Sequence, residues 1–296
     1  MSDADLQCIS PIGDRCGEAA TWSSSEQALY WCDVNRFLIH RMGADGGVKS
    51  WFFKEPVTAL SLTDTEGELL VALGSRLILW RADTNERRDQ GFHLKSWPKV
   101  RLNDGRAAPN GDFWVGSMAN NVGPRGEMVE AERGLGELFR VRRGAPTTTH
   151  KSKLGISNTV CWSPDERTFY FGDTQENMIW AYDYDSDTGE IQNERPFFSG
   201  YERGAPDGST VDSAGCLWNC RFGGSCVVRV TPEGRIDRVL ELPVRNVTTC
   251  AFGGTDFRTL FITTASILTD ESDQLAGSLF TLDTTTPGLD GFKAHV

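Results

Sequence analysis

Residues 109–114 have the sequence Pro-Asn-Gly-Asp-Phe-Trp, and the pattern in this short stretch decides the fold. Its first four residues favour a chain reversal, and the two aromatic residues that follow favour a β-strand. The same order, a polar turn and then an apolar strand, occurs six times. The six strand pairs are Tyr30-Trp31, Leu70-Val71, Phe113-Trp114, Phe169-Tyr170, Leu217-Trp218 and Leu260-Phe261. Successive pairs lie 40 to 56 residues apart.

This repeat predicts an all-β fold, a six-bladed β-propeller. Each pair is followed by a second β-rich run, and no long window has the spacing of an amphipathic helix. Repeats of about 40 to 50 residues with four strands each are typical of propeller blades. We expect one propeller domain over residues 1–296, closed by the run Leu6–Ile9 as the outer strand of the last blade. The alternative, two separate β-sandwiches, predicts a linker between the halves, and the sequence has no Pro-, Gly- or Ser-rich linker.

Composition excludes several classes of partner. The 296 residues are 39% hydrophobic, which is enough for a large core, and 30 basic against 41 acidic residues give a net charge of −11. This charge argues against nucleic acid and anionic membranes as partners. The apolar runs are only as long as strands and the N-terminus is acidic, so we expect a cytoplasmic protein. We further expect a monomer or weak oligomer. Eight cysteines without a CxxC pair predict reduced, mostly buried thiols.

One position of the repeat carries side chains with oxygen atoms. It lies 10 to 12 residues before each strand pair, where the first strand of a blade begins at one mouth of the central channel. The six residues there are Glu18, Ala59, Asn103, Asn158, Asp207 and Thr249. Buried carboxylates that face one another are costly unless a cation lies between them, and an oxygen set without Cys or His favours Ca²⁺, Mg²⁺ or Mn²⁺. The alternative is that Asn103–Gly105 and Pro206–Gly208 are only turns at strand entries.

Two further features belong to the same mouth. Arg101 lies two residues before Asn103, so its guanidinium could donate to a substrate carbonyl or hydroxyl, or could form a surface salt bridge instead. Two long segments, Ala119–Leu135 in blade three and Ser266–Ala276 in blade six, return to the mouth face. Long loops on a functional face are lids or specificity walls, and the alternative here is a solvated acidic loop.

Five segments form a recognisable set of motifs. They are Gly17-Glu18, Arg101–Gly105 followed by Gly116–Met118, Ser157-Asn158 before Trp162–Asp165, Pro206–Gly208 before Asp212–Trp218, and Ala251–Gly254. Together they resemble the GEGP, RxNDG…GTM, SNG…WSPD, PDG…LW and FGG motifs of the gluconolactonase, regucalcin and luciferin-regenerating enzyme family. The resemblance spans residues 17–282, almost the whole chain.

The resemblance implies a propeller that binds one divalent metal ion, which could be Ca²⁺, Mg²⁺, Mn²⁺, Zn²⁺ or Fe²⁺, through Glu18, Asn158 and Asp207. It implies hydrolysis of a sugar-acid (aldono) lactone, with Asp207 as general acid or base and with Arg101 and Asn103 binding the substrate. Asn121 is a further substrate-binding candidate, because it stands where some members carry a lid glutamate.

The sequence departs from the family pattern beside two of these ligands. Ala19-Ala20 replaces a Gly-Pro pair after Glu18, and Thr159 replaces a glycine after Asn158. Both departures lie next to predicted ligands, so the geometry of the mouth could differ from that of other members.

Lactone hydrolysis has two competitors on the same architecture. The metal would polarise the lactone carbonyl and make a water easier for Asp207 to deprotonate. A calcium-dependent phosphotriesterase-like hydrolase would use a similar oxygen site, and a third possibility is a non-catalytic metal-binding propeller. The pair Arg101 and Asn103 favours the lactonase over the phosphotriesterase. The complete ligand set favours an enzyme over a scaffold.

Overall fold

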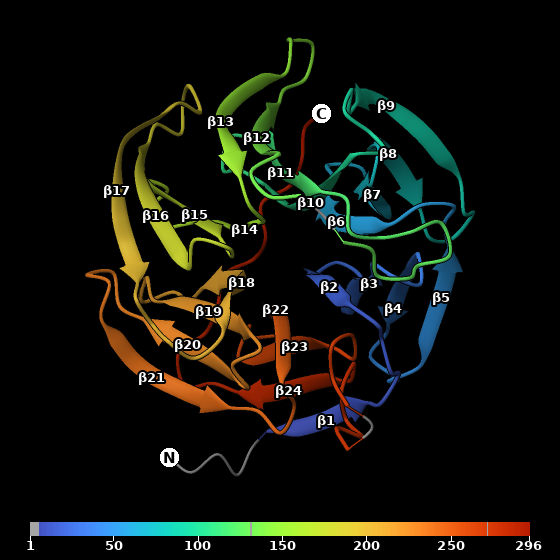
Figure 1. Cartoon of the computed structure of the whole chain (residues 1–296), viewed down its shortest axis with the longest axis vertical. Helices are drawn as coiled ribbons and strands as arrows, with labels where there is room; N and C mark the ends of the chain where they lie inside the picture. Colours follow the sequence, from blue (N-terminus) through green and yellow to red (C-terminus); the bar gives the residue numbers. More distant parts are fainter. Residues whose placement is uncertain (1–5, 131, 271) are drawn as a thin grey trace.

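The computed structural model describes residues 6–130, 132–270 and 272–296. These residues form 24 β-strands in six four-stranded antiparallel sheets, arranged as blades around a central axis (Figure 1). Within the described ranges there is no helix, and therefore none that could span a membrane. The all-β, six-bladed propeller predicted from the repeat is confirmed.

The strands of the first three blades follow the chain from the axis outward. Blade one contains β2 (Gly17–Ser23), β3 (Ala28–Asp33), β4 (Leu38–Met42) and β5 (Val48–Phe52). Blade two contains β6 (Val57–Leu62), β7 (Glu68–Leu73), β8 (Arg76–Arg81) and β9 (Arg87–His93). Blade three contains β10 (Val100–Ala107), β11 (Phe113–Ala119), β12 (Gly136–Val141) and β13 (Thr148–Leu154).

The last three blades repeat this order, and the sixth uses strands from both ends of the chain. Blade four contains β14 (Ser157–Trp162), β15 (Thr168–Asp173), β16 (Met178–Tyr184) and β17 (Ile191–Ser199). Blade five contains β18 (Ala205–Val211), β19 (Leu217–Phe222), β20 (Cys226–Val230) and β21 (Ile236–Glu241). Blade six contains β22 (Asn246–Gly253), β23 (Thr259–Ala265), β24 (Leu279–Asp283) and β1 (Gln7–Ser10). The predicted closure is confirmed, because β1 pairs with β24.

The innermost strand of every blade has an irregular register near the mouth. The shifts lie between Glu18 and Thr21, Val57 and Ala59, Leu102 and Gly105, Asn158 and Cys161, Pro206 and Ser209, and Val247 and Cys250. A bulge of this kind bends a strand and redirects its side chains, and bulges are common beside active sites. The repeated shift therefore places the same position of each blade at the axis.

The hydrophobic core lies between neighbouring blades. Between blades one and two, Trp80 is fully buried and packs against Tyr30, Trp51 and Phe53 with ring centroids 5.2 to 6.4 Å apart. Burial of one such large side chain contributes about 2–3 kcal/mol. Because each blade buries a face against the next one, the inner strands are held at fixed positions around the channel.

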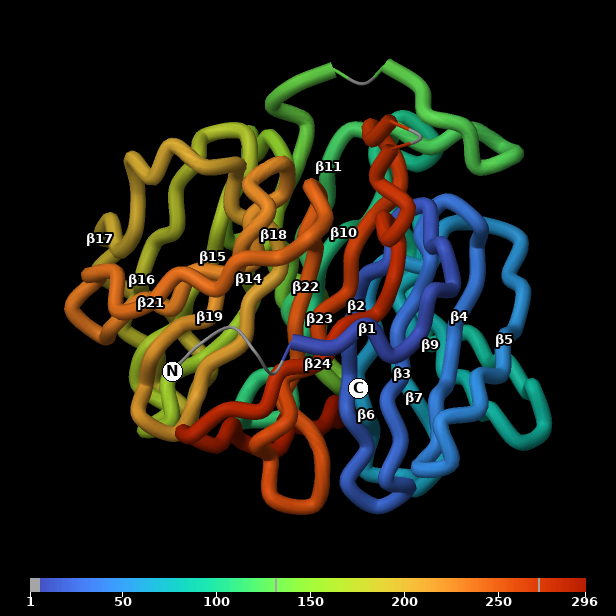
Figure 2. Tube along the Cα trace, turned by 90° about the horizontal axis from the view of Figure 1, so that it is seen from below, coloured from blue at the N-terminus to red at the C-terminus, as the bar shows by residue number. Residues whose placement is uncertain are grey.

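The two ends of the channel differ. The described parts of both long segments, residues 120–130 and 132–135 after β11 and 266–270 and 272–278 after β23, project from the same face (Figure 2), as the sequence predicts. On the opposite face the C-terminal tail, residues 284–296, crosses the axis (Figure 1). The Gly288 amide donates to the carbonyl of Phe257, and the Ala294 amide donates to that of Leu62. The tail thus joins blade six to blade two.

Candidate active site at the channel mouth

The three predicted metal ligands lie at equivalent places on three inner strands. Glu18 is on β2, Asn158 on β14 and Asp207 on β18, and each lies at the register shift of its strand. Asn158 and Asp207 are buried, whereas Glu18 retains partial exposure. Asn103 occupies the same place on β10, as the repeat predicts.

The site gathers negative charge without a paired cation. Burial raises the pKa of Glu18 well above its ordinary value, and the charges of Asp207 and Asp104 raise it further. Burial and Asp104 act in the same way on the pKa of Asp207. Within the described residues no cation lies within 4 Å of these three carboxylates. A divalent cation would offset this repulsion, so the donor set fits the predicted metal.

Amide groups complete the oxygen set in a fixed orientation. The Asn158 amide donates from Nδ2 to Oγ1 of Thr174 over 2.8 Å, which leaves its Oδ1 free to accept. Asn103 Nδ2 donates to that Oδ1 over 3.3 Å and to the Ser157 carbonyl over 2.8 Å. An amide oxygen accepts two bonds, so Asn158 Oδ1 keeps one lone pair for a ligand.

Arg101 is less available to a substrate than its sequence position suggests. Its side chain is only 5% exposed, and burial lowers its pKa to about 10, which leaves it charged at neutral pH. Nε and Nη2 donate to Asn121 Oδ1 over 3.1 and 2.9 Å, and Nη1 donates to Asn103 Oδ1 over 2.6 Å and to the Leu102 carbonyl over 3.0 Å. One of its five N–H groups remains for a substrate. Arg101 thus links Asn103 to Asn121, the three residues predicted to bind substrate.

A buried polar network beneath Asp207 was not predicted from the sequence. Thr159 Oγ1 donates to the Asp207 carbonyl over 2.6 Å and lies 2.9 Å from Ser209 Oγ. Asn219 Nδ2 donates to the same Ser209 oxygen over 2.9 Å, and Arg221 Nη1 donates to Asn219 Oδ1 over 3.2 Å. The departure at Thr159 was the one visible signal, since its hydroxyl begins this network.

The two departures from the family pattern share a backbone conformation. Ala19 has φ = 57° and Thr159 has φ = 56°, the left-handed region that favours glycine. A β-branched residue is rare there, and for Thr159 the hydroxyl bonds to the Asp207 strand hold the conformation. At residue 19 the methyl group of alanine cannot form a hydrogen bond, so no side-chain bond offsets the cost of the left-handed backbone.

We therefore expect Ala19→Gly to stabilise the protein by about 0.5–1 kcal/mol, because it removes the left-handed penalty. The neighbouring Ala20→Gly is the matched control. Ala20 is buried in β2 without a positive φ, so its replacement should cost about 1 kcal/mol. Thermal unfolding of the two variants checks the difference in sign, and an equal loss of stability in both would contradict it.

Thiols do not join the oxygen set. Burial and the charges of Glu18 and Asp207 raise the pKa of Cys16 well above its ordinary value, so this thiol stays protonated. Across the described residues no three His, Cys, Asp or Glu side chains form a cluster of metal-binding type. The predicted ligand set contains two such residues and one amide, so this finding leaves it untested.

Both long segments are docked on the mouth face. Asn35 Nδ2 donates to the Gly126 carbonyl over 2.8 Å, and Val122 is buried in the core between blades one and two. In the second segment the Ile267 carbonyl accepts from Asn246 Nδ2 over 2.6 Å. The first segment carries Asn121 to Arg101, so it forms one wall of the site.

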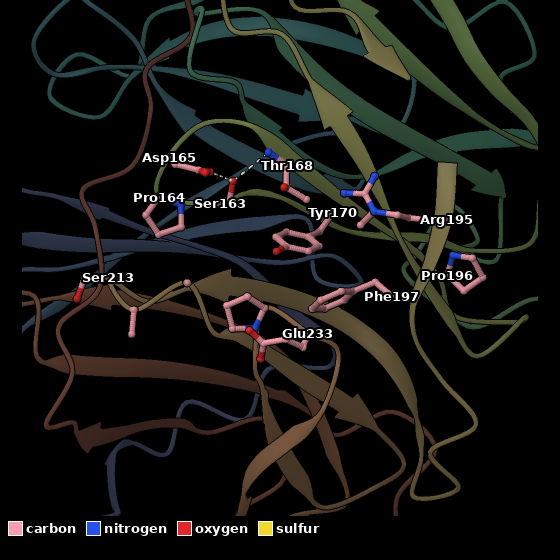
Figure 3. A pocket seen from close by; sticks show the side chains of 14 residues that line it. Ser163, Pro164, Asp165, Thr168, Tyr170, Arg195, Pro196, Phe197, Ser213 and Glu233 are labelled. Carbon is pink, nitrogen blue, oxygen red and sulfur yellow. Dashed lines mark hydrogen bonds between the residues drawn. The ribbon is translucent and has the colours of Figure 1, made fainter. Parts of the chain in front are cut away.

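A large surface cavity lies away from these residues. It has a volume of about 510 Å³ and lies between blades four and five, on the face of the C-terminal tail (Figure 3). Tyr170 and Phe197 form its floor, and Asp165, Arg195 and Glu233 stand around it. None of the predicted site residues lines it.

Comparison with known proteins decides the family. Residues 16–266 match the model of the SMP-30/gluconolactonase/LRE-like region. The chain belongs to this SMP-30/gluconolactonase family. The family resemblance inferred from the motifs is thereby confirmed.

Individual members of the SMP-30/gluconolactonase family match over nearly the full length. The chain is 32% identical to a 6-deoxy-6-sulfogluconolactonase of Pseudomonas putida, with 96% of each chain covered. It is also 32% identical to a pentonolactonase of Haloferax volcanii, with 95% of each covered. Among solved structures, regucalcin from Agrobacterium tumefaciens, a calcium-binding protein, superposes with a TM-score of 0.90 at 26% identity, covering 98% of this chain and 97% of that one.

Proposed function

We propose that this chain is a lactonase that hydrolyses a sugar lactone to the free aldonic acid, with one divalent metal ion held by Glu18, Asn158 and Asp207. The observation that carries the proposal is the set of carboxylates at the mouth that no cation among the described residues pairs within 4 Å. Support also comes from the relatives that are named 6-deoxy-6-sulfogluconolactonase and pentonolactonase.

The reaction needs a nucleophilic water, a polarised carbonyl and a proton for the leaving oxygen. A bound divalent metal supplies positive charge that polarises the carbonyl and lowers the pKa of a water. Asp207 takes the proton from the attacking water and returns it to the ring oxygen as the C–O bond of the lactone breaks. The remaining N–H of Arg101 and the amides of Asn103 and Asn121 orient the sugar hydroxyls.

The function is tested by proton release from a panel of aldono-1,4- and 1,5-lactones. The protein is first stripped with EDTA, and Ca²⁺, Mg²⁺, Mn²⁺ or Zn²⁺ is then restored separately. We expect hydrolysis of at least one sugar lactone that returns only with metal. An organophosphate triester in the same panel distinguishes the phosphotriesterase-like alternative. Metal binding without turnover of any ester would support a non-catalytic propeller.

Metal affinity should depend on pH in a defined direction. The pKa values of Glu18 and Asp207 are raised in the metal-free protein, so these groups hold protons at pH values where ordinary carboxyls are ionised. A cation must displace these protons before it binds. Metal affinity therefore increases with pH, by up to about tenfold per pH unit for each proton displaced. Calorimetric titration with Ca²⁺ from about pH 5 to about pH 8 checks this. An affinity that stays constant across that range would contradict it.

A further inference from the structure

Arg106 is a positive charge without a hydrogen-bond partner in the central channel. It lies near the end of β10, on the side of the tail, and keeps partial exposure. Among the described residues no side chain or carbonyl accepts a hydrogen bond from its guanidinium, and no carboxylate lies within 4 Å of it. Its electrostatic neighbour is Asp104: burial raises the pKa of that carboxyl, and the charge of Arg106 offsets part of the rise. A guanidinium has five donors, so Arg106 presents them to the channel.

The space around Arg106 consists of two small cavities of about 60 Å³ each. Both are lined by Arg106, Thr210, Leu289, Gly291 and Phe292, so the cavities adjoin at the guanidinium. The walls come from the inner strands, and the tail covers the end of the channel. The space can hold a few water molecules or one small ion, and it is too small for a sugar.

The polar groups of these cavities favour an anion. Thr210 has a hydroxyl without a hydrogen-bond partner among the described residues, and it can donate beside the guanidinium. Thr21 and Ser61 also line the first cavity, but their hydroxyls already donate to backbone carbonyls, so the donors for an anion come from Arg106 and Thr210. Arg106 is the one charged residue of the first cavity. Asp290 lines the second cavity, but it is exposed and accepts from Ser24 Oγ over 2.8 Å.

We infer that Arg106 and Thr210 form a binding site for one small monovalent inorganic anion, such as chloride, bromide or nitrate, at the tail end of the channel. A single guanidinium balances one negative charge. Its weak hydration suits anions that lose their water readily. The site is separate from the proposed metal site, since it uses the other end of the inner strands, and it does not depend on the proposed function.

The proposal is tested by thermal unfolding of the metal-stripped protein at constant ionic strength. Sodium bromide or nitrate replaces sodium 2-(N-morpholino)ethanesulfonate, whose anion is too large for these cavities. At an anion concentration ten times Kd, the wild-type Tm should rise by about 2 °C. Arg106→Gln should abolish this rise and Thr210→Val should reduce it. Arg235→Gln, which removes an exposed arginine on another turn, should keep it.

The Arg106→Gln variant and a crystallographic measurement distinguish a specific anion site from a general salt effect. An equal rise of Tm in the wild type and Arg106→Gln would overturn the proposal, because the effect would then be a general salt effect. If Arg106→Gln does not fold, crystals of the wild type in sodium bromide decide the question through anomalous scattering. A bromide peak at the Arg106 guanidinium supports the site. A channel without such a peak at saturating bromide overturns it.

Discussion

Replacing Asp207 with asparagine should lower kcat by about 10³–10⁴-fold while it raises the thermal stability of the metal-free protein. The loss of activity follows from the proposed role, since the amide can neither accept the proton of the attacking water nor supply the ligand charge. The gain in stability follows from burial, which raises the pKa of Asp207 together with the charge of Asp104.

The sign of the stability effect depends on pH. A carboxyl whose pKa is higher in the folded than in the unfolded state destabilises the fold at pH values above its ordinary pKa, where the unfolded chain ionises freely. Asp207→Asn removes that cost, so its advantage in Tm over the metal-free wild type should be largest at about pH 8 and should shrink towards about pH 4. The backbone bond from Thr159 Oγ1 to the residue 207 carbonyl is kept in the variant, so the strand stays in place.

Asn103→Ala is the matched control for the role of Asp207. Asn103 lies at the equivalent place on β10, the inner strand of blade three, and is assigned to the substrate, so its loss should mainly raise KM, by about tenfold, with a smaller change in kcat. Measurement of kcat, KM and Tm for both variants with saturating metal and without it separates the two roles. Near-native turnover by Asp207→Asn with metal bound would refute the mechanism.

The fold could be predicted from the sequence because its determinants are local and repeated. A turn followed by an apolar strand is readable within a few residues, as at 109–114, and six copies at similar spacing specify six blades. The same regularity placed Glu18, Asn103, Asn158 and Asp207 at equivalent positions, which the register shifts of the inner strands confirm. Their chemical roles remain predictions.

What could not be predicted depends on contacts between distant segments. Asp104 was part of a turn motif, and only the folded structure shows that its charge raises the pKa of Glu18 and Asp207. Arg101 was expected to face the substrate, and its donors are instead mostly used by Asn103 and Asn121. The position of the C-terminal tail across the axis has no local signal either.

Arg221 provides the second large effect, this time on stability. It is 1% exposed and carries no carboxylate partner within ion-pair distance among the described residues. Its Nη2 donates to Asn177 Oδ1 over 2.7 Å and to the carbonyls of Gly204 and Tyr201 over 2.7 and 3.0 Å. Nε donates to the Arg203 carbonyl over 3.1 Å. One guanidinium therefore fixes the loop between β17 and β18 just before Asp207.

Arg221→Met should cost about 3 kcal/mol, because methionine fills a similar volume but leaves several buried oxygens without a donor. For a chain of this size the loss corresponds to a fall in Tm of about 5 °C. Arg221→Lys keeps the charge but not the planar set of donors, so its Tm should lie between the Tm of the wild type and that of Arg221→Met. Arg235→Met, at a position with 78% of the side chain exposed, should change stability by less than about 0.5 kcal/mol.

Arg221→Lys distinguishes two roles of Arg221: holding the loop before Asp207 by hydrogen bonds, and placing a positive charge near Asp207. If Arg221 acts only as a positive charge near Asp207, Arg221→Lys should restore both Tm and kcat. If it acts through the hydrogen bonds that hold residues 201–204, Lys should restore little of either, since an ammonium has three donors and cannot reach acceptors spread over a plane. The five bonds from Nε, Nη1 and Nη2 favour the second outcome. A Tm for Arg221→Met within about 1 °C of the wild type would show that water replaces the guanidinium at no cost.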